Sequence, residues 1–204
     1  MRNILRLCLS TVALLVAGLF STTQTSNAQW CYPSYTEWGY ACNQPYGASW
    51  TEITIGSVTN ATGCSGYTDY GTSVPFRLFA GMPNTVTVKA KTFGDWPYSS
   101  EIPLNIWIDY NRNFNFDANE LINPPGLPCN GTINSRTFTI SPLASLTPGM
   151  YKARFKAVGP PEGNSQNACY SYYGEVEDYM IEILPPLSDP SPIAVSITNP
   201  GDGS

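Results

Sequence analysis

Apolar and polar residues alternate along this chain in short runs, and Gly or Pro separates many runs from the next. Such period-two alternation is typical of β-strands that bury one face and leave the other wet. No stretch after residue 28 sustains a helical period. The pattern predicts an all-β fold, an antiparallel β-sandwich of jelly-roll type. The predicted strands are Ile53–Ile55, Val74–Leu78, Val86–Lys91, Leu104–Ile108, Phe138–Ile140, Tyr151–Ala157 and Val176–Leu184.

The first residues have the composition of a secretory signal peptide. Arg2 and Arg6 precede the apolar run Leu7–Phe20, and small residues lead to a cleavage site after Ala28. No later stretch is apolar for long enough to cross a bilayer. The sequence therefore predicts a secreted or cell-surface protein with no membrane span in its mature chain.

The composition changes again at Pro185, where a Pro-rich spacer begins. Ile193–Ile197 then alternates like a strand, close to the last residue. We expect this to be the truncated first strand of a covalently linked immunoglobulin-like domain, with a disordered tail as the alternative. The expected organisation is a signal peptide over residues 1–28, one β-sandwich domain over 29–185, and linker plus truncated strand over 186–204.

Charge and residue usage exclude several functions. Without the signal peptide, eight basic residues face fifteen acidic ones, a formal charge of −7. Nucleic acid and anionic membranes are poor partners for such a chain. The chain has no His, which excludes a Ser-His-Asp or Cys-His centre and a His-ligated zinc site.

Five cysteines follow the signal peptide, and an exported chain commonly pairs them. Two disulfides and one remaining thiol is the simplest count. The sequence leaves the pairing open. The preferred arrangement joins Cys129 to Cys169, and Cys64 to either Cys31 or Cys42.

The stretch from Trp107 to Glu120 carries oxygen-bearing side chains on alternate positions and then a carboxylate. This is the ligand spacing of a calcium loop of about twelve residues, in which hard oxygen donors surround the ion. The pattern predicts a structural Ca²⁺ site on a loop that follows a strand. Its candidate ligands are Asp109, Asn111, Asn113, Asn115, Asp117 and Glu120.

Phe114 occupies the sixth position of this loop, where a helix–loop–helix calcium motif uses Gly for a sharp turn. The alternative to a metal site is therefore an Asn-rich turn in which short amide side chains cap their own backbone.

Aromatic residues crowd the segment from residue 30 to 50. Trp30, Trp38 and Trp50 are candidates for an exposed platform that stacks on a glycan. The alternative is that these rings cover a small β core.

Two further stretches carry acidic residues, Gly66–Tyr70 and Gly174–Tyr179. If the last strand is regular, Glu175 and Glu177 point to the same side as its core-facing residues. Buried carboxylates are costly unless they are paired or bind a metal. Either a bulge turns them outward, or Arg or Ca²⁺ satisfies them, and a salt-bridged pair at the sheet rim is the plain alternative. Asp69, Glu175, Glu177 and Asp178 are thus additional metal or structural candidates.

These stretches, in this order, resemble the GEVED domain, a module of exported bacterial proteins, especially from the Bacteroidetes. Gly174–Asp178 spells the family signature, and Gly66–Tyr70 and Trp107–Asn111 are similar to its other two motifs. The resemblance extends over roughly residues 30–185. It differs at Asn113-Phe114, where the family usually has Asp-Gly. The resemblance implies a β-sandwich accessory module and assigns no catalytic residue or ligand.

The function that fits these observations is a non-catalytic, calcium-stabilised binding or adhesion module, with an extracellular glycan or protein as partner. An enzyme that uses two carboxylates for glycoside hydrolysis is an alternative, with candidates among Glu175, Glu177, Asp178, Asp109 and Asp69. A purely structural spacer is a third.

Overall fold

The computed structural model describes residues 29–35, 47–93, 101–158, 166–171 and 174–187. The signal-peptide segment, Trp38, Cys42 and the expected immunoglobulin-like strand lie outside these residues. The elements in chain order are β1 (Ser34–Tyr35), β2 (Ala48–Ile55), β3 (Val58–Ala61), β4 (Tyr67–Asp69), β5 (Arg77–Phe79), β6 (Asn84–Thr92), β7 (Glu101–Ile102), β8 (Leu104–Ile108), η1 (Ala118–Glu120), β9 (Leu121–Ile122), β10 (Leu127–Pro128), β11 (Ile133–Ile140), β12 (Gly149–Val158), β13 (Tyr170–Ser171) and β14 (Gly174–Leu184).

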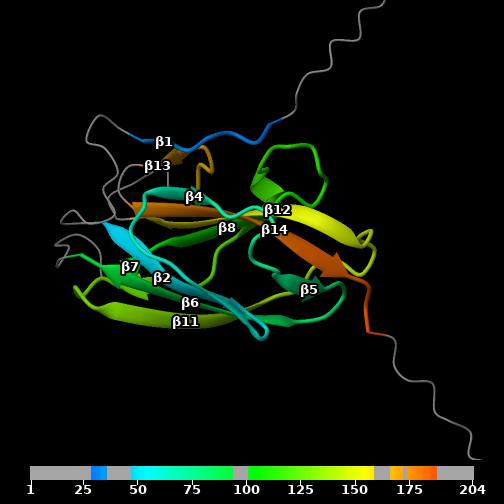
Figure 1. The fold of residues 1–204 in the computed structure, drawn as a ribbon, viewed down its shortest axis with the longest axis horizontal. Helices are drawn as coiled ribbons and strands as arrows, with labels where there is room; N and C mark the ends of the chain where they lie inside the picture. Colours follow the sequence, from blue (N-terminus) through cyan, green and yellow to red (C-terminus); the bar gives the residue numbers. More distant parts are fainter. Residues whose placement is uncertain (1–28, 36–46, 94–100, 159–165, 172–173, 188–204) are drawn as a thin grey trace, which may run out of the picture.

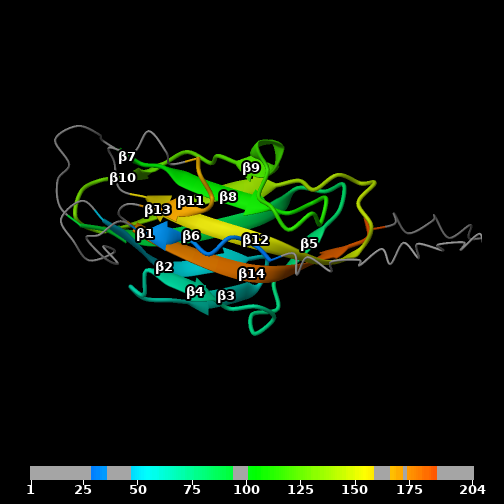
Figure 2. The ribbon, with the colours of Figure 1, turned by 90° about the horizontal axis from the view of Figure 1, so that it is seen from above.

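Two sheets pack face to face, as a β-sandwich requires. The four-stranded sheet has the order β11-β6-β2-β3, and the six-stranded sheet has the order β4-β14-β12-β8-β9, with β5 also paired to β14. The short parallel ribbon β1–β13 lies over the outer face of the six-stranded sheet (Figure 1). The view from above shows β4, β14, β12 and β8 crossing the molecule beneath that ribbon (Figure 2). The predicted all-β sandwich is confirmed.

The pairing is mainly antiparallel, and the exceptions gather on β14. Both β4 and β5 join this strand in parallel, β4 along its first half and β5 near its end. The strand β14 thus connects three segments that lie far apart in the sequence. This mixed edge departs from the purely antiparallel sheet that the sequence predicted.

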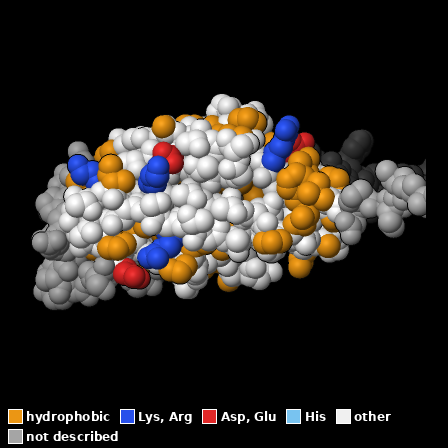
Figure 3. Space-filling view, turned by 90° about the horizontal axis from the view of Figure 1, so that it is seen from below, with side chains coloured by type: hydrophobic (Ala, Val, Ile, Leu, Met, Phe, Trp, Pro, Cys, Tyr) orange, Lys and Arg blue, Asp and Glu red, His pale blue; other side chains and the backbone are white. Residues whose placement is uncertain are grey.

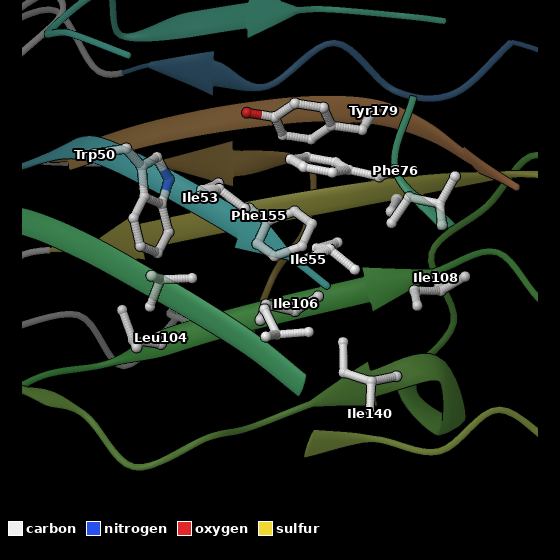
Figure 4. Close-up of a cluster of buried hydrophobic side chains, with 14 of the residues drawn as sticks. Trp50, Ile53, Ile55, Phe76, Leu104, Ile106, Ile108, Ile140, Phe155 and Tyr179 are labelled. Atoms are coloured by element: carbon white, nitrogen blue, oxygen red, sulfur yellow. The ribbon is translucent and has the colours of Figure 1, made fainter. Parts of the chain in front are cut away.

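The apolar core lies between the two sheets. Alternate residues of β2, β6, β8, β12 and β14 point into it. The large core side chains of Trp50, Phe155 and Tyr179, and of Phe76 just before β5, are fully buried (Figure 4). Tyr179 is in contact with three rings of this core, those of Tyr70, Phe76 and Phe155. Because the Tyr179 side chain contacts rings from both the first and the second half of the chain, β14 is central to the packing of the core as well as to the pairing of strands.

The outer face of the four-stranded sheet is wet, as alternation predicts. Cross-strand pairs line it, among them the Glu52–Lys89 ion pair at 2.9 Å and the Thr87–Thr137 hydroxyl pair at 2.9 Å. The molecule seen from this side presents mainly backbone and uncharged polar side chains, with hydrophobic side chains in scattered patches and only a few charges (Figure 3).

The outer face of the six-stranded sheet is not wet, and here the sequence prediction was wrong. Lys152, Arg154 and Lys156 alternate with core residues on β12, yet all three are buried. Residues 29–35 (the covering segment) and 166–171 cover them. The backbone carbonyls of Cys31 and Ala168 accept hydrogen bonds from Arg154, and that of Asn167 accepts one from Lys156. A local pattern cannot show that a distant segment will cover a polar face.

Six of the seven predicted strands are present at or near their predicted positions. The strand predicted at Val74–Leu78 is limited to β5, because Phe76 N donates to the carbonyl of Val74 in a tight local turn. Eight of the fourteen strands in the described residues are only two to four residues long, and these short segments gave no alternation to recognise. Among the described residues, none lies in a helix with the length and hydropathy of a membrane crossing.

The preferred pairing of Cys129 with Cys169 was wrong. Cys31 pairs with Cys169 across a sequence separation of 138 residues, whereas Cys129 is a half-buried thiol. Cys64 is disulfide-bonded as well. The covered face of the sheet explains the observed pair, because residues 29–35 must lie across β12 to bring Cys31 to the 166–171 segment.

Candidate functional site

The three sequence motifs meet in one row across the six-stranded sheet. Asp69 of β4 lies opposite Asp178 of β14, which lies opposite Arg154 of β12, which lies opposite Trp107 of β8. Residues that are opposite each other in adjacent strands are close enough for their side chains to interact. The sheet therefore brings together motifs that are separated by up to about a hundred residues in sequence.

Arg154 and Asp178 form a buried ion pair at the centre of this row. Nε and Nη2 of Arg154 donate to the two carboxylate oxygens at 2.7 and 2.8 Å, and both side chains are essentially inaccessible. The remaining donors of Arg154 bind the carbonyls of Cys31 and Ala168 at 2.8 and 2.7 Å. The Tyr67 hydroxyl donates to Asp178 at 2.9 Å. A fixed guanidinium fork suits this planar recognition, which Lys could not reproduce.

A second ion pair lies beside the first and reaches the surface. Lys152 Nζ is 2.6 Å from Asp69 Oδ2 and 3.7 Å from Asp178 Oδ2. The ammonium also lies 5.5 Å from the centre of the Trp30 ring. Asp69 and Asp178, which the sequence suggested as additional ligands for the metal loop, thus pair with Lys152 and Arg154.

The loop that follows β8 folds around the Asp109 carboxylate, which is 1% exposed. Its Oδ1 accepts the backbone N–H of Asn113 at 3.1 Å, and its Oδ2 accepts that of Phe114 at 3.1 Å. The indole Nε1 of Trp30 also donates to Oδ2, at 2.8 Å. Asp109 therefore fixes both the loop and the segment that covers the sheet.

The other predicted ligands continue the same network. Nδ2 of Asn111 and Nδ2 of Asn113 both donate to Asp117 Oδ2, at 2.9 and 2.8 Å. The buried Glu120 accepts from the backbone N–H groups of Asn111 and Asp117. The side-chain oxygen of Asn113 accepts from Asn115 N at 2.8 Å, which is the self-capping bond of an Asx turn. In the part of the chain that the structure describes, no three His, Cys, Asp or Glu side chains lie close enough to form a metal-binding group.

Phe114 makes the sharp turn that Gly was expected to make. Its φ is 67°, in the left-handed region that bulky residues rarely adopt. The bond from its N–H to Asp109 and the contact of its ring with Trp30, 4.8 Å between centroids, hold it there. The loop therefore makes its sharp turn with Phe114 in place of Gly.

Glu175 and Glu177 point into the core, as the register of the last strand predicted. Neither is paired with Arg, Lys or a rim partner among the described ion pairs. Glu175 instead accepts the backbone N–H groups of Trp50 and Ser65, each at 2.8 Å. The Trp50 N–H is available because a β-bulge interrupts the pairing of β2 with β6 between Trp50 and Glu52. The carboxylate thus supplies the bond that the bulge removes from the sheet.

Glu177 has a different environment. Its Oε2 accepts the Tyr179 hydroxyl at 2.6 Å, while its Oε1 has no hydrogen-bond partner among the described residues. Burial raises the pKa of Glu177 to about 8, and the charge of Glu175 adds to the rise. Burial also raises the pKa of Glu175, although hydrogen bonds from Ser65 and Trp50 oppose the rise. Glu177 is therefore a neutral acid near pH 7.

The raised pKa of Glu177 predicts that the free energy of unfolding falls as pH rises. The unfolded carboxyl ionises near its ordinary pKa of 4.5 and the folded one near 8, so the stabilising difference is complete below 4.5 and is lost as pH rises to 8. Between pH 6 and 7.5 we expect a loss of about 2 kcal/mol, at about 1.4 kcal/mol per pH unit. Glu177→Gln should remove this part of the slope, measured by urea unfolding at both pH values. Parallel pH profiles for the two proteins would contradict the expectation.

The three tryptophans that the sequence suggested as an exposed platform lie in different environments. Trp50 is fully buried in the core, so its assignment to an exposed platform was wrong and the alternative of core packing holds. Trp30 is half-buried and lies over β12, between Asp109 and Lys152. Trp38 lies outside the described residues.

Sequence reasoning missed the cations of this site. One face of β12 carries Lys152, Arg154 and Lys156. Arg154, the middle one, is paired in register with Asp178 of β14. Three of the eight basic residues after the signal peptide lie on this one face. This concentration of positive charge was the sequence signal that could have predicted a buried charge cluster.

The fold and this row define a β-sandwich whose last strand carries acidic residues on both faces. The family model described as "GEVED domain" matches residues 103–182, which include the Trp107–Asn111 and Gly174–Asp178 motifs. The match supports the resemblance to the GEVED family over this part of the chain. The Gly66–Tyr70 motif lies outside the matched range but is paired to β14 within the sheet.

No curated protein matches the chain. One solved structure that it resembles is that of a Pseudomonas fluorescens alkylpurine DNA glycosylase, AlkC, bound to DNA containing an abasic site analogue. The identity is 10% and the TM-score 0.28, over 64% of this chain and 30% of that one. A likeness at this level carries no argument about fold or function.

Proposed function

We propose that this chain is a non-catalytic module, stabilised by Ca²⁺ at the Asp109–Glu120 loop, that binds an extracellular glycan or protein as part of a secreted or cell-surface protein. The observation that carries the proposal is the folding of this loop around Asp109, with Asp117 and Glu120 bonded into the same network. The Cys31–Cys169 disulfide fits an oxidising compartment.

The loop residues fit a hard cation in chemistry. Carboxylate and amide oxygens are the ligands that Ca²⁺ prefers. The Asn111 and Asn113 oxygens each accept one backbone N–H, and a carbonyl oxygen keeps a second lone pair for a cation. The two amide N–H groups that now bind Asp117 would give way to the ion. The bound ion would fix the loop and so offset the entropy of ordering it.

The buried acids support a module without catalysis. Glycoside hydrolysis needs two carboxyl groups that a substrate can reach. Glu175 and Glu177 are fully buried between the sheets, and Asp178 is engaged by Arg154 and Tyr67. A substrate could approach the two glutamates only if the core opened.

Calcium should raise the melting temperature of the purified chain. At a Ca²⁺ concentration a hundredfold above Kd, binding to the folded state adds about 2.7 kcal/mol, which corresponds to an increase of about 5–10 °C over the chelator sample. Asp117→Asn should remove most of this increase, because it takes away a ligand charge while keeping the shape of the side chain. Differential scanning calorimetry with Ca²⁺ and with chelator measures both.

The control is Glu182→Gln, which removes a carboxylate from the exposed Arg77–Glu182 pair. This variant should keep the full response to Ca²⁺. Superimposable melting curves of the unmodified chain with Ca²⁺ and with chelator would rule out the metal. The spacer function would stand if Ca²⁺ stabilises the chain and no partner binds.

A further inference from the structure

A small cavity of about 160 Å³ opens beside the covering segment, residues 29–35. It lies over the Lys152–Asp69 and Arg154–Asp178 ion pairs. Its walls come from four separate parts of the chain: the covering segment, β4, β12 and β14. The residues that line it are Gln29, Trp30, Tyr32, Tyr67, Asp69, Lys152 and Asp178. Sites for drug-sized ligands measure roughly 300–1,000 Å³, so this cavity suits a smaller group such as a single ring.

The aromatic walls are held in place before any ligand arrives. Trp30 is fixed by its bond to Asp109 and by its contact with Phe114. Tyr67 is fixed by its bond to Asp178, and the Tyr32 ring meets it edge-on at 4.8 Å. Tyr32 itself is 62% exposed. A fixed ring binds a flat apolar surface with little further loss of conformational entropy.

The charged groups around the cavity balance one another. Lys152 and Asp69 form an ion pair at its wall, and Asp178 is neutralised by Arg154 behind it. An anionic ligand would meet two carboxylates, and a cationic ligand would meet an ammonium. A neutral ligand with several hydroxyl groups could use both members of the Lys152–Asp69 pair, because the ammonium donates hydrogen bonds and the carboxylate accepts them.

We propose that this cavity binds a neutral pyranose ring of a glycan, with the rings of Trp30 and Tyr32 against its C–H face and Asp69 and Lys152 on its hydroxyl groups. The C–H face of such a sugar is apolar and packs on aromatic rings, while its hydroxyl groups need both donors and acceptors. The inference rests on the proposed binding function and names its site and ligand class.

The test is a ¹H–¹⁵N NMR titration of the purified chain, with its disulfides intact, against neutral sugars. The probes are glucose, galactose, mannose and N-acetylglucosamine, and the β-linked disaccharides of each. The indole N–H of Trp30 is the reporter and is assigned by its disappearance in Trp30→Phe. We expect at least one sugar of the panel to shift this resonance saturably at millimolar concentration.

Two variants test the assigned contacts. Tyr32→Ala removes an exposed ring, and Asp69→Asn removes the acceptor charge, and each should weaken binding about tenfold. The matched controls are Leu143→Ala, an exposed apolar side chain elsewhere, and Glu182→Gln, another carboxylate in a surface ion pair. Both controls should bind like the unmodified chain.

Three results would overturn the inference. The first is the absence of any saturable Trp30 shift with the panel. The second is binding by Tyr32→Ala and by Asp69→Asn as tight as that of the unmodified chain. The third is a shift caused by glucuronic acid or a short peptide but by no neutral sugar. Each is distinct from failure of the calcium-stabilised module, which calorimetry tests without sugar.

Discussion

Replacing Arg154 by Met is expected to lower the free energy of unfolding by about 3–5 kcal/mol, the cost of removing one partner of a buried ion pair. The reason is local. Asp178, which is 1% exposed, would lose its bidentate partner, and the carbonyls of Cys31 and Ala168 would lose their donors. Urea unfolding of both proteins at pH 7 measures the difference.

Two companion variants make this prediction specific. The double variant Arg154→Met with Asp178→Leu should recover part of the loss, because an apolar pair leaves no uncompensated charge. Arg77→Met removes an Arg from the exposed pair with Glu182 and should cost less than about 1 kcal/mol. A loss for Arg154→Met as small as that for Arg77→Met would show that the buried pair does not hold the covering segment.

Removing the Cys31–Cys169 disulfide is expected to cost about 4 kcal/mol. The bond closes a loop of 138 residues, and closure of so long a loop in the unfolded chain restricts its entropy strongly. The variant Cys31→Ala with Cys169→Ala should therefore unfold at lower urea concentration. The shift of the Trp30 indole resonance would report release of the covering segment.

Cys129→Ala is the control for this variant, because it removes a half-buried thiol and leaves the bridge intact. Its effect should be about 1 kcal/mol, the usual size for a single core truncation of this kind. Equal urea midpoints for the bridged chain and the bridge-free variant would mean that the contacts of Arg154 and Trp30 fix residues 29–35 without the bridge.

The strands that alternate over many residues were predictable from sequence, and the covering of the sheet was not. The predicted Leu104–Ile108 coincides with β8, and Tyr151–Ala157 lies within β12, because each strand buries alternate residues in the main core. The strand β4 is too short to show a pattern. Its place beside β14 depends on the parallel pairing of Asp69 with Asp178, which no local rule contains.

The candidate site shows the same division. The oxygen spacing from Asp109 to Glu120 depends on neighbours within one loop, so the sequence could identify that group of residues. The partner of Asp109 that the sequence could not supply is Trp30, which comes from 79 residues earlier. The inward direction of Glu175 and Glu177 followed from strand alternation. The bond from Trp50 N–H to Glu175 depends on a bulge in β2, which the sequence does not reveal.

The central position of β14 has a consequence for how the chain is made. Synthesis proceeds from the N-terminus, so residues 29–69 leave the ribosome long before the strand that receives them. Cys31 must wait for Cys169, the Trp50 N–H must wait for Glu175, and Asp69 must wait for its neighbour on β14. The contacts that fix the covering segment, the β2 bulge and β4 can therefore form only after the last part of the domain has emerged.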